Sequence, residues 1–543
     1  MPEIFQRLPS ILASWIRPNI QLFMSSREPH MWVISLMIGL AVSAAVIVFR
    51  EIILLIQLVW LGVNTETVAS AAREIHWLWV LLTPAVGGLL VGWLLKSFIP
   101  SRRCGGVADA IEAKVPGGRD IEMKTGLWSA VISALSLGVG ASAGREGPMV
   151  HLGATLSTWI SKRFDLPAWG RRTLLGCGVA SAVSASFNAP IAGVLFAHEV
   201  ILGHYSKRSF IPIVISSVMG TLLSRLWFGD NAAFSIPDYQ ITSNLEFPAF
   251  VLLGAVCGLI AITFQFSLIA SDYVARSITM PIWLRPAVGG LMIGSIALVY
   301  PEVLGVGYEA TDMALKNQFA LNVLIPLIIA KTAATAITLA SRFGGGVFSP
   351  SLYIGAMTGG AFGLIAASVF PDMASSQGLY AILGMGAVAG AVIGAPISTT
   401  VIVFELTGGY SLSIALLLTV SIANGINMAL HGRSFFIWQL EARGFNLRDG
   451  PHRATTRTTM VASFMTLLPK YGEDPGPVQE GATVLRPDTN LETALRIFDD
   501  GGHSRLPVVN ARDPEKIIGW ATQVEALRHY NKALVDLSEE EHR

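Results

Sequence analysis

The chain has few charged residues and few cysteines for its length. Charged side chains make up 14% of its 543 residues, and its three cysteines are Cys104, Cys177 and Cys257. Three cysteines in apolar surroundings are too few for a disulfide or zinc framework, so we interpret them as small packing residues. The formal net charge is +1, which gives no indication of a charged partner, and we expect no nucleic acid partner.

The sequence also lacks the clusters that a membrane-embedded enzyme needs. It contains no H-E-x-x-H pattern, and its apolar stretches hold no close pair of carboxylates in an acid–base arrangement. We therefore expect neither an enzyme nor a metal site. A cation or organic-solute transporter stays open as another class, although carboxylate rings or unwound carbonyls would be its usual means of binding.

Long apolar runs dominate the chain instead. Apolar residues make up 52% of it, and many runs approach the roughly 20 residues that cross a bilayer. We expect an all-α polytopic membrane protein. The clearest runs are residues 31–48, 77–95, 127–143, 210–226, 250–270, 286–299, 321–340 and 414–429. Two further stretches, 176–201 and 382–405, are cut by Gly or Pro and predict broken helices buried among neighbours.

The apolar part of the chain contains an internal repeat. Gly-Arg-Glu-Gly-Pro at 144–148 matches the glycine-rich segment 344–350 when their prolines are aligned, and Glu146 then falls opposite Phe348. A second match joins Asn-Ala-Pro-Ile to Gly-Ala-Pro-Ile, each followed by a glutamate. These segments are 188–191 with Glu199, and 394–397 with Glu405.

Each repeat therefore contains a proline that marks a helix start at membrane depth. Proline is tolerated in the first turn of a helix, where its missing N–H would be unpaired. Helix starts present N–H groups and the positive end of the helix dipole, so two of them directed at one point form an anion site. The preceding glycines allow the backbone to approach the ion closely.

Glu146 is the most informative residue of this pattern. A carboxylate at membrane depth is costly and is usually functional. Among amides that favour anions, Glu146 can occupy the place of the anion as a tethered competitor and so act as a gate. The alternative is a structural glutamate paired with Arg145 or with a neighbouring amide.

Four motifs in this order resemble the CLC family of chloride channels and chloride/proton exchangers. They are GREGP from Gly144, NAPIAGVLFAHEV from Asn188, GGVFSP from Gly345 and GAPISTTVIVFELTG from Gly394. The resemblance implies an inverted-repeat fold with broken and re-entrant helices, and a homodimer in the lipid bilayer with one pore per subunit. Chloride is then the transported ligand, and Glu146 the external gating residue. The implied anion-binding residues of these motifs are Arg145, Gly147, Gly346, Val347 and Phe348.

The sequence departs from the CLC pattern at two anion-binding positions. The family usually has Gly-Ser-Gly-Ile-Pro where this chain has Cys-Gly-Gly-Val-Ala at 104–108, so Gly105 replaces the serine. Gly106 and Val107 complete this predicted segment. Phe436 stands where the family has a tyrosine. Both changes remove a hydroxyl, so we expect weaker chloride selectivity, with another anion such as nitrate as a remote alternative.

A third departure concerns protons. Proton-coupled members commonly carry an inner glutamate just after the position of Glu199, and this chain has Val200 there. His198 could relay protons instead because its ordinary pKa lies near neutrality, but packing is the alternative role of a histidine on an apolar helix. Glu199 could likewise be a structural carboxylate held by backbone amides. We predict a passive voltage- or pH-gated chloride channel, with a proton-coupled antiporter as the alternative.

Composition divides the chain into three parts. Residues 1–30 predict an amphipathic cytoplasmic segment, 31–444 the transport domain with repeats at 31–228 and 247–430, and 445–543 a cytoplasmic tail. Within the tail, residues 460–530 predict helix, strand, strand and helix, which resembles a single cystathionine-β-synthase (CBS) module of α/β structure. A dimerisation cap and an adenine nucleotide sensor stay open as its role, and no cofactor is otherwise expected. We expect the protein in the cell (inner) membrane.

Overall fold

A computed structural model describes most of the chain, and it separates into two units. The described residues are 15–115, 118–230, 234, 237, 239–407, 412–445, 456, 459–468, 482–510 and 513–542. One unit, the membrane unit, comprises residues 1–111 and 121–436. The other, the tail unit, comprises residues 112–120 and 437–543. Of the predicted N-terminal segment, residues 1–14 lie outside the described residues, and residues 15–25 are helical.

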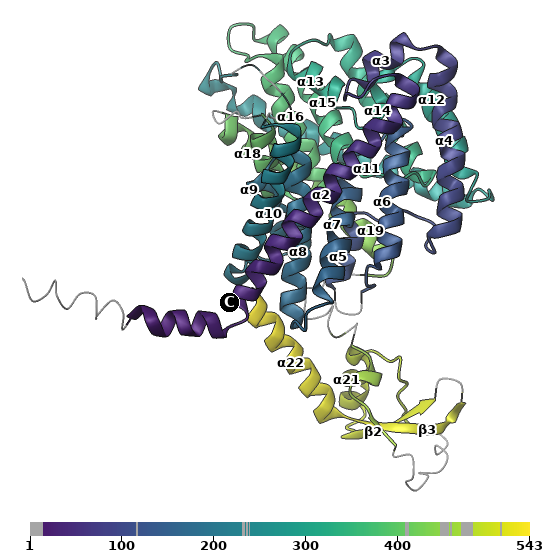
Figure 1. Ribbon diagram of the computed structural model, residues 1–543, viewed down its shortest axis with the longest axis vertical. Helices are drawn as coiled ribbons and strands as arrows, with labels where there is room; N and C mark the ends of the chain where they lie inside the picture. The colour runs from purple at the N-terminus through teal and green to yellow at the C-terminus, as the bar shows by residue number, and fades with distance from the viewer. Residues whose placement is uncertain are drawn as a thin grey trace, which may run out of the picture. The chain divides into compact units, whose positions relative to one another are not determined.

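Most of the membrane unit consists of two successive series of helices (Figure 1). The first series is α2 Glu28–Leu61, α3 Val68–Glu74, α4 Trp77–Phe98, α5 Val107–Lys114, α6 Met123–Gly138, α7 Glu146–Ser161, α8 Ala168–Phe187, α9 Pro190–Phe196, the π-helix η1 Ala197–Leu202 and α10 Lys207–Phe228. The second is η2 Asn244–Glu246, α11 Phe247–Ser277, α12 Arg285–Ala297, η3 Pro301–Val303, α13 Tyr308–Leu315, α14 Leu321–Ala340, α15 Phe348–Val369, α16 Gln377–Ile393, α17 Pro396–Thr407 and α18 Ser413–Leu430. Helix α19, Phe435–Glu441, follows them.

The helices confirm a polytopic membrane protein. Among the described residues, seven helical segments are long and apolar enough to cross a bilayer: α2, α4, α10, α11, α14, α15 and residues 413–441. The predicted runs 127–143 and 286–299 form the shorter helices α6 and α12. Helix α15 is a span that the predicted apolar runs did not include.

Matched glycines pack the two repeats in the same way. Helix α7 lies against α8 and α15 lies against α16. A Cβ on Gly153 would lie 2.4 Å from the carbonyl oxygen of Gly178, and a Cβ on Gly355 would lie 2.3 Å from that of Gly384. Larger side chains would separate these helices, so glycine at the matching positions 153 and 355 of the two repeats is explained by backbone contact.

The two broken stretches are confirmed, and each break is capped by the other repeat. Helix α8 ends at Asn188 with φ 57°, and α16 ends at Gly394 with φ 75°. Helices α9 and α17 then begin at prolines. Glu405 accepts from the Ala192 N–H at 2.7 Å, and Glu199 accepts from the Ser398 N–H at 2.7 Å. Each carboxylate thus satisfies the start of the opposite helix and its dipole.

The tail unit contains a small three-stranded sheet with two described helices. Its elements are η5 Val461–Ser463, β1 Thr466–Leu467, α21 Leu491–Asp500, β2 Arg505–Asn510, β3 Asp513–Thr522 and α22 Gln523–His542. The strand order is β1-β3-β2, with both pairs antiparallel. Phe498, Leu506 and Val508 belong to its apolar core. The predicted order of helix, strand, strand and helix is therefore confirmed.

The reciprocal caps predict a matched loss of stability. Replacing Glu405 by Ala leaves the Ile191 and Ala192 N–H groups without their acceptor in an apolar setting. A hydrogen bond to a charged group contributes about 1.5–3 kcal/mol, so Glu405→Ala should lower the apparent melting temperature of the purified protein in detergent. Tryptophan fluorescence on heating measures this change.

The control for this prediction lies on the surface. Glu74→Ala changes an exposed carboxylate at the end of α3 and should melt with the unchanged protein. Glu199→Ala should resemble Glu405→Ala, because it removes the corresponding cap of α17. Melting of both cap variants at the temperature of the Glu74 variant would contradict the capping role.

Candidate anion site

The two glycine-rich breaks meet through their backbones. Gly144 and Gly346 exchange two N–H to carbonyl hydrogen bonds of 2.7 Å and form an isolated antiparallel bridge. A Cβ on Gly346 would lie 3.0 Å from the backbone nitrogen of Gly147, so a larger residue would not fit without a shift. Helices α7 and α15 consequently start from one junction in the interior of the membrane unit.

This bridge uses one amide that was predicted to contact an anion. The Gly346 N–H donates to the carbonyl of Gly144, so anion binding by this amide stays a prediction and requires the bridge to release it. Val347 caps α15 and Phe348 is its first residue, so the N–H groups of the first turn begin after the bridge. The Phe348 ring is buried, with its centroid 5.0 Å from that of Phe187 and 6.4 Å from that of Phe196.

Glu146 lies at this junction and is only half satisfied. It is the first residue of α7 and is 3% exposed. Its Oε1 accepts from the Ser349 hydroxyl at 2.6 Å and from the Tyr308 hydroxyl at 3.2 Å. Its Oε2 is buried and has no hydrogen-bond partner among the described residues. A buried carboxylate oxygen without a donor raises the free energy of this conformation, so the position favours release of the side chain.

Tyr308 connects Glu146 to a cavity that contains charges of both signs. The Arg145 guanidinium lies over the Tyr308 ring, 4.7 Å from its centroid, and donates to Glu66 at 2.7 Å. Arg50 donates to the same Glu66 oxygen at 2.8 Å. The cavity is lined by Arg50, Ile53, Leu54, Gln57, Glu66, Val68, Ala69, Arg145, Glu302, Leu304, Val306, Gly307, Tyr308, Glu309 and Ala310.

Glu66 keeps its negative charge in this setting. Desolvation opposes ionisation of the carboxyl, but the Arg145 and Arg50 charges outweigh it and lower its pKa from 4.5 to about 2. Arg145 was predicted to bind an anion, and in this conformation its Nη1 is paired with the Glu66 carboxylate. An incoming anion would have to compete with that carboxylate.

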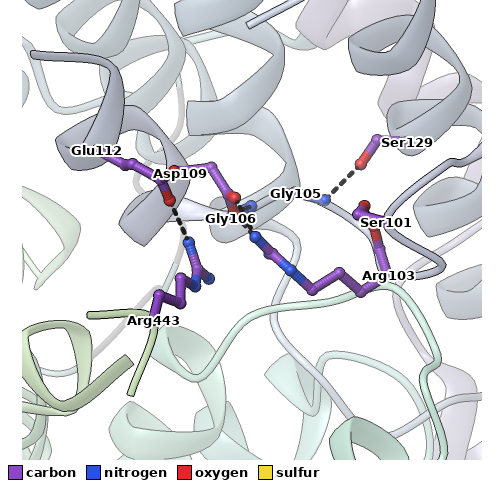
Figure 2. Close-up of polar contacts among 8 residues, drawn as sticks. All are labelled: Ser101, Arg103, Gly105, Gly106, Asp109, Glu112, Ser129 and Arg443. Atoms are coloured by element: carbon purple, nitrogen blue, oxygen red, sulfur yellow. Dashed lines mark hydrogen bonds and ion pairs between the residues drawn. The ribbon is translucent and has the colours of Figure 1, made fainter. Parts of the chain in front are cut away.

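The start of α5 uses its first N–H groups internally. Figure 2 shows Gly105 donating to the Ser129 hydroxyl at 2.7 Å and Gly106 donating to the Asp109 carboxylate at 2.8 Å. Arg103 holds Asp109 through two contacts of 2.7 and 3.1 Å. Anion binding by these two amides stays a prediction, and it requires Ser129 and Asp109 to release them.

Figure 2 also shows an ion pair that lies within the tail unit. Glu112 accepts from Arg443 at 3.1 Å.

Two further residues of the predicted anion site are apolar. Val107 is buried at the start of α5, and Phe436 is buried at the second position of α19 with its ring centroid 6.3 Å from that of Phe435. Neither side chain has a hydroxyl, so neither can donate a hydrogen bond to an ion.

The predicted relay residues lie on η1 and have structural partners. His198 contacts the Val194 carbonyl at 2.9 Å through Nδ1 and the Ser209 hydroxyl at 3.3 Å through Nε2. Its ring is stacked on Tyr205. Glu199 caps α17 as described, and Val200 is half-buried. These contacts agree with the packing and capping alternatives for the first two residues.

Several residues of the site were not predicted from the sequence. Ser349 follows Phe348 in the second break, so its Ser-Pro helix start was visible, but its bond to Glu146 was not. Tyr308 approaches from the start of α13 and Glu66 from the loop between α2 and α3, and no local spacing indicates them. Among the described residues, no group of three or more His, Cys, Asp or Glu side chains is placed to hold a metal.

Comparisons with known proteins agree with this geometry. The family model described as "Voltage gated chloride channel" matches residues 87–428, and the CBS domain model matches residues 478–532. The chain is 32% identical over 391 residues to a ClcB-like protein of Ralstonia nicotianae, across 70% of this chain and 90% of the relative.

Two further similarities extend over about three quarters of the chain. The voltage-gated ClC-type chloride channel ClcB of Escherichia coli is 30% identical, across 75% of this chain and 98% of the relative. The solved structure of a slow cyanobacterial Cl⁻/H⁺ antiporter superimposes with a TM-score of 0.69 at 24% identity, across 77% of this chain and 99% of the other. With its paired helix starts, its buried Glu146 and the matched region 87–428, the chain belongs to the voltage-gated chloride channel (CLC) family and is an integral membrane protein of anion transport.

Proposed function

We propose that the protein is a passive chloride channel in which Glu146 gates one pore in each subunit. The observation that carries the proposal is the position of Glu146 at the junction of α7 and α15, with one carboxylate oxygen bound and the other without a donor. An anion that enters this junction takes the position of the negatively charged Glu146 carboxylate. Protonation or a change in voltage would release Glu146 and open the path.

The passive mechanism is supported by the residues on η1. Val200 has no titratable group, and the Glu199 carboxylate accepts from two N–H groups at the start of α17. His198 is held by Val194 and Ser209. A proton relay through this helix would have to break bonds that stabilise the fold.

A proton-coupled antiporter is the second candidate. The superimposed cyanobacterial structure is described as a Cl⁻/H⁺ antiporter, although its 24% identity supports the fold alone. Glu146 is itself a titratable group in the proposed path, and in an exchanger it would carry the proton as well as gate the anion. Transport of another anion, such as nitrate, would follow from the hydroxyls that Gly105 and Phe436 lack.

Assembly and location are further parts of this proposal. We infer a homodimer in the cell (inner) membrane, with the C-terminal tail in the cytoplasm. Membership of the CLC family and the apolar helices support the membrane setting. The CBS region at 478–532 would then act as a dimerisation cap, with binding of an adenine nucleotide as the other role.

The mechanism is tested by the reversal potential of purified protein in planar bilayers. With chloride and pH gradients varied separately, a passive channel should follow the chloride Nernst potential and ignore the pH gradient. Glu146→Ala should keep this behaviour with a higher open fraction. Uphill proton movement driven by a chloride gradient, lost in Glu146→Ala, would identify the antiporter instead.

The acid dependence of flux should follow Glu146 and not Glu66. Glu66 has a pKa lowered to about 2, so its ion pairs are complete above its ordinary pKa of 4.5 and are lost only as the pH falls toward 2. Between pH 4.5 and 7 its charge is therefore constant. Chloride efflux from liposomes should rise on acidification in the unchanged protein and in Glu66→Gln, and should be flat in Glu146→Gln. Flat efflux in Glu66→Gln with a retained response in Glu146→Gln would reverse the assignment.

The Tyr308 hydroxyl should hold the gate closed. Tyr308→Phe removes a donor to Glu146 Oε1 and keeps the ring beneath Arg145. A hydrogen bond to a charged group is worth about 1.5–3 kcal/mol, so the closed-to-open ratio should fall about tenfold or more. Single-channel recording measures that ratio. Tyr300→Phe, which removes a hydroxyl elsewhere, is the matched control, and an equal effect of both variants would exclude a specific role for Tyr308.

A further inference from the structure

Lys331 carries a buried positive charge that the proposed gating of the anion path has not yet used. It lies on α14 and is 0% exposed. Among the described residues, no carboxylate forms an ion pair with it, and Glu302, the acidic residue of η3, accepts from Arg73. Burial of an ammonium group costs free energy unless the group is hydrogen-bonded. The contacts of Lys331 therefore indicate its role.

The ammonium group of Lys331 is held by the loop between η3 and α13. Its Nζ donates to the carbonyls of Val303 and Gly305, both at 3.0 Å. A Cβ built on Gly307 would lie 3.2 Å from the same nitrogen, so the backbone of this loop passes close to the charge. An ammonium group has three donors, and two of them bind this one loop. The segment 303–307 is therefore folded around Lys331.

The Tyr353 ring lies on another side of the ammonium group. Its centroid is 5.1 Å from Lys331 Nζ, within the range of a cation–π contact. A Cβ on Gly307 would lie 2.8 Å from Cδ2 of this ring, so the loop packs directly on Tyr353. Tyr353 follows Ser349 by four residues on α15, and residues four apart share a helix face. Lys331 thus joins the loop to the helix that carries Ser349.

The loop ends at a residue that donates to Glu146. Gly307 has φ 91°, a left-handed conformation that suits glycine, and Tyr308 follows it as the first residue of α13. The Tyr308 hydroxyl donates to Glu146 Oε1, which also accepts from Ser349. The position of Tyr308 relative to α15 is therefore set by the loop that Lys331 holds.

We propose that Lys331 is a positioning residue that keeps the Tyr308 hydroxyl within reach of Glu146. Its two hydrogen bonds hold the segment 303–307, and its contact with Tyr353 places that segment against α15. Without the ammonium group, two buried carbonyls lose their donor and the loop can move away from α15. The inference rests on the proposed gating by Glu146 and adds a residue that acts on Glu146 through Tyr308.

Lys331→Met is the first test, because it keeps an unbranched side chain and removes both hydrogen bonds. Hydrogen–deuterium exchange of the full-length protein, measured by mass spectrometry, should be about tenfold faster in peptides that cover residues 303–311. Lys96→Met changes an exposed lysine in the last turn of α4 and is the matched control.

A second variant keeps this test decisive if Lys331→Met does not fold. Lys331→Gln has a shorter side chain, which draws the donor away from the loop, so exchange of residues 303–311 should again exceed that of the control. Exchange at the rate of the Lys96 variant in a folded Lys331 variant would overturn the proposal.

A double-mutant cycle separates positioning of Tyr308 from a general loss of stability. In single-channel recordings, Lys331→Met should lower the closed-to-open ratio about tenfold, as expected for Tyr308→Phe. When Tyr308→Phe is already present, Lys331→Met should change the ratio by less than about twofold, because the hydroxyl through which it acts is absent. Full additivity of the two changes would show that Lys331 acts by another route and would overturn the inference.

These measurements distinguish failure of the inference from failure of the proposed function. If Glu146→Gln leaves gating unchanged, the proposed gate is wrong, whereas faster exchange of residues 303–311 in Lys331→Met would still establish that Lys331 holds the loop. If Glu146→Gln and Tyr308→Phe both alter gating while Lys331→Met does not, the proposed function stands and the positioning role of Lys331 is excluded.

Discussion

Exchange of hydrogen bonds between the two repeats is the interaction on which the rest of the membrane unit depends. A bilayer offers no water to satisfy an interrupted helix, so each broken backbone must find its partners inside the protein. Gly144 and Gly346 pair directly, and Glu199 and Glu405 each cap a helix start of the opposite repeat. The interruptions that make an anion site possible are thus tolerated because the repeats satisfy each other.

The same exchange sets the surroundings of Glu146, the residue that we propose as the gate. The Gly346 N–H donates to Gly144 in the bridge. The Glu146 carboxylate accepts from two hydroxyl groups through one oxygen, and its other oxygen has no donor among the described residues. A carboxylate with donors to both oxygens would be held firmly in this position, and one without any donor would not stay buried.

Side-chain donors are distributed differently from what the motif departures suggested. Gly105 and Phe436, which stand where the family pattern has serine and tyrosine, predicted an ion path with few hydroxyl groups. In the structure, Tyr308 and Ser349 bring hydroxyls to the Glu146 carboxylate. The space at Gly105 is filled by the His151 ring. A side chain at position 105 would overlap this ring.

Composition, repeated motifs and proline positions were enough to predict the membrane class, the two broken stretches, the helix start at Glu146 and the helix–strand order of the tail. These features depend on residues close together in the chain. The partners of the site could not be predicted, because Tyr308 reaches it from the start of α13 and Glu66 from the loop after α2. Only packing of the repeats decided that Gly346 bonds to Gly144. Local sequence determines where a helix can start, whereas the tertiary structure decides which donors and acceptors meet there.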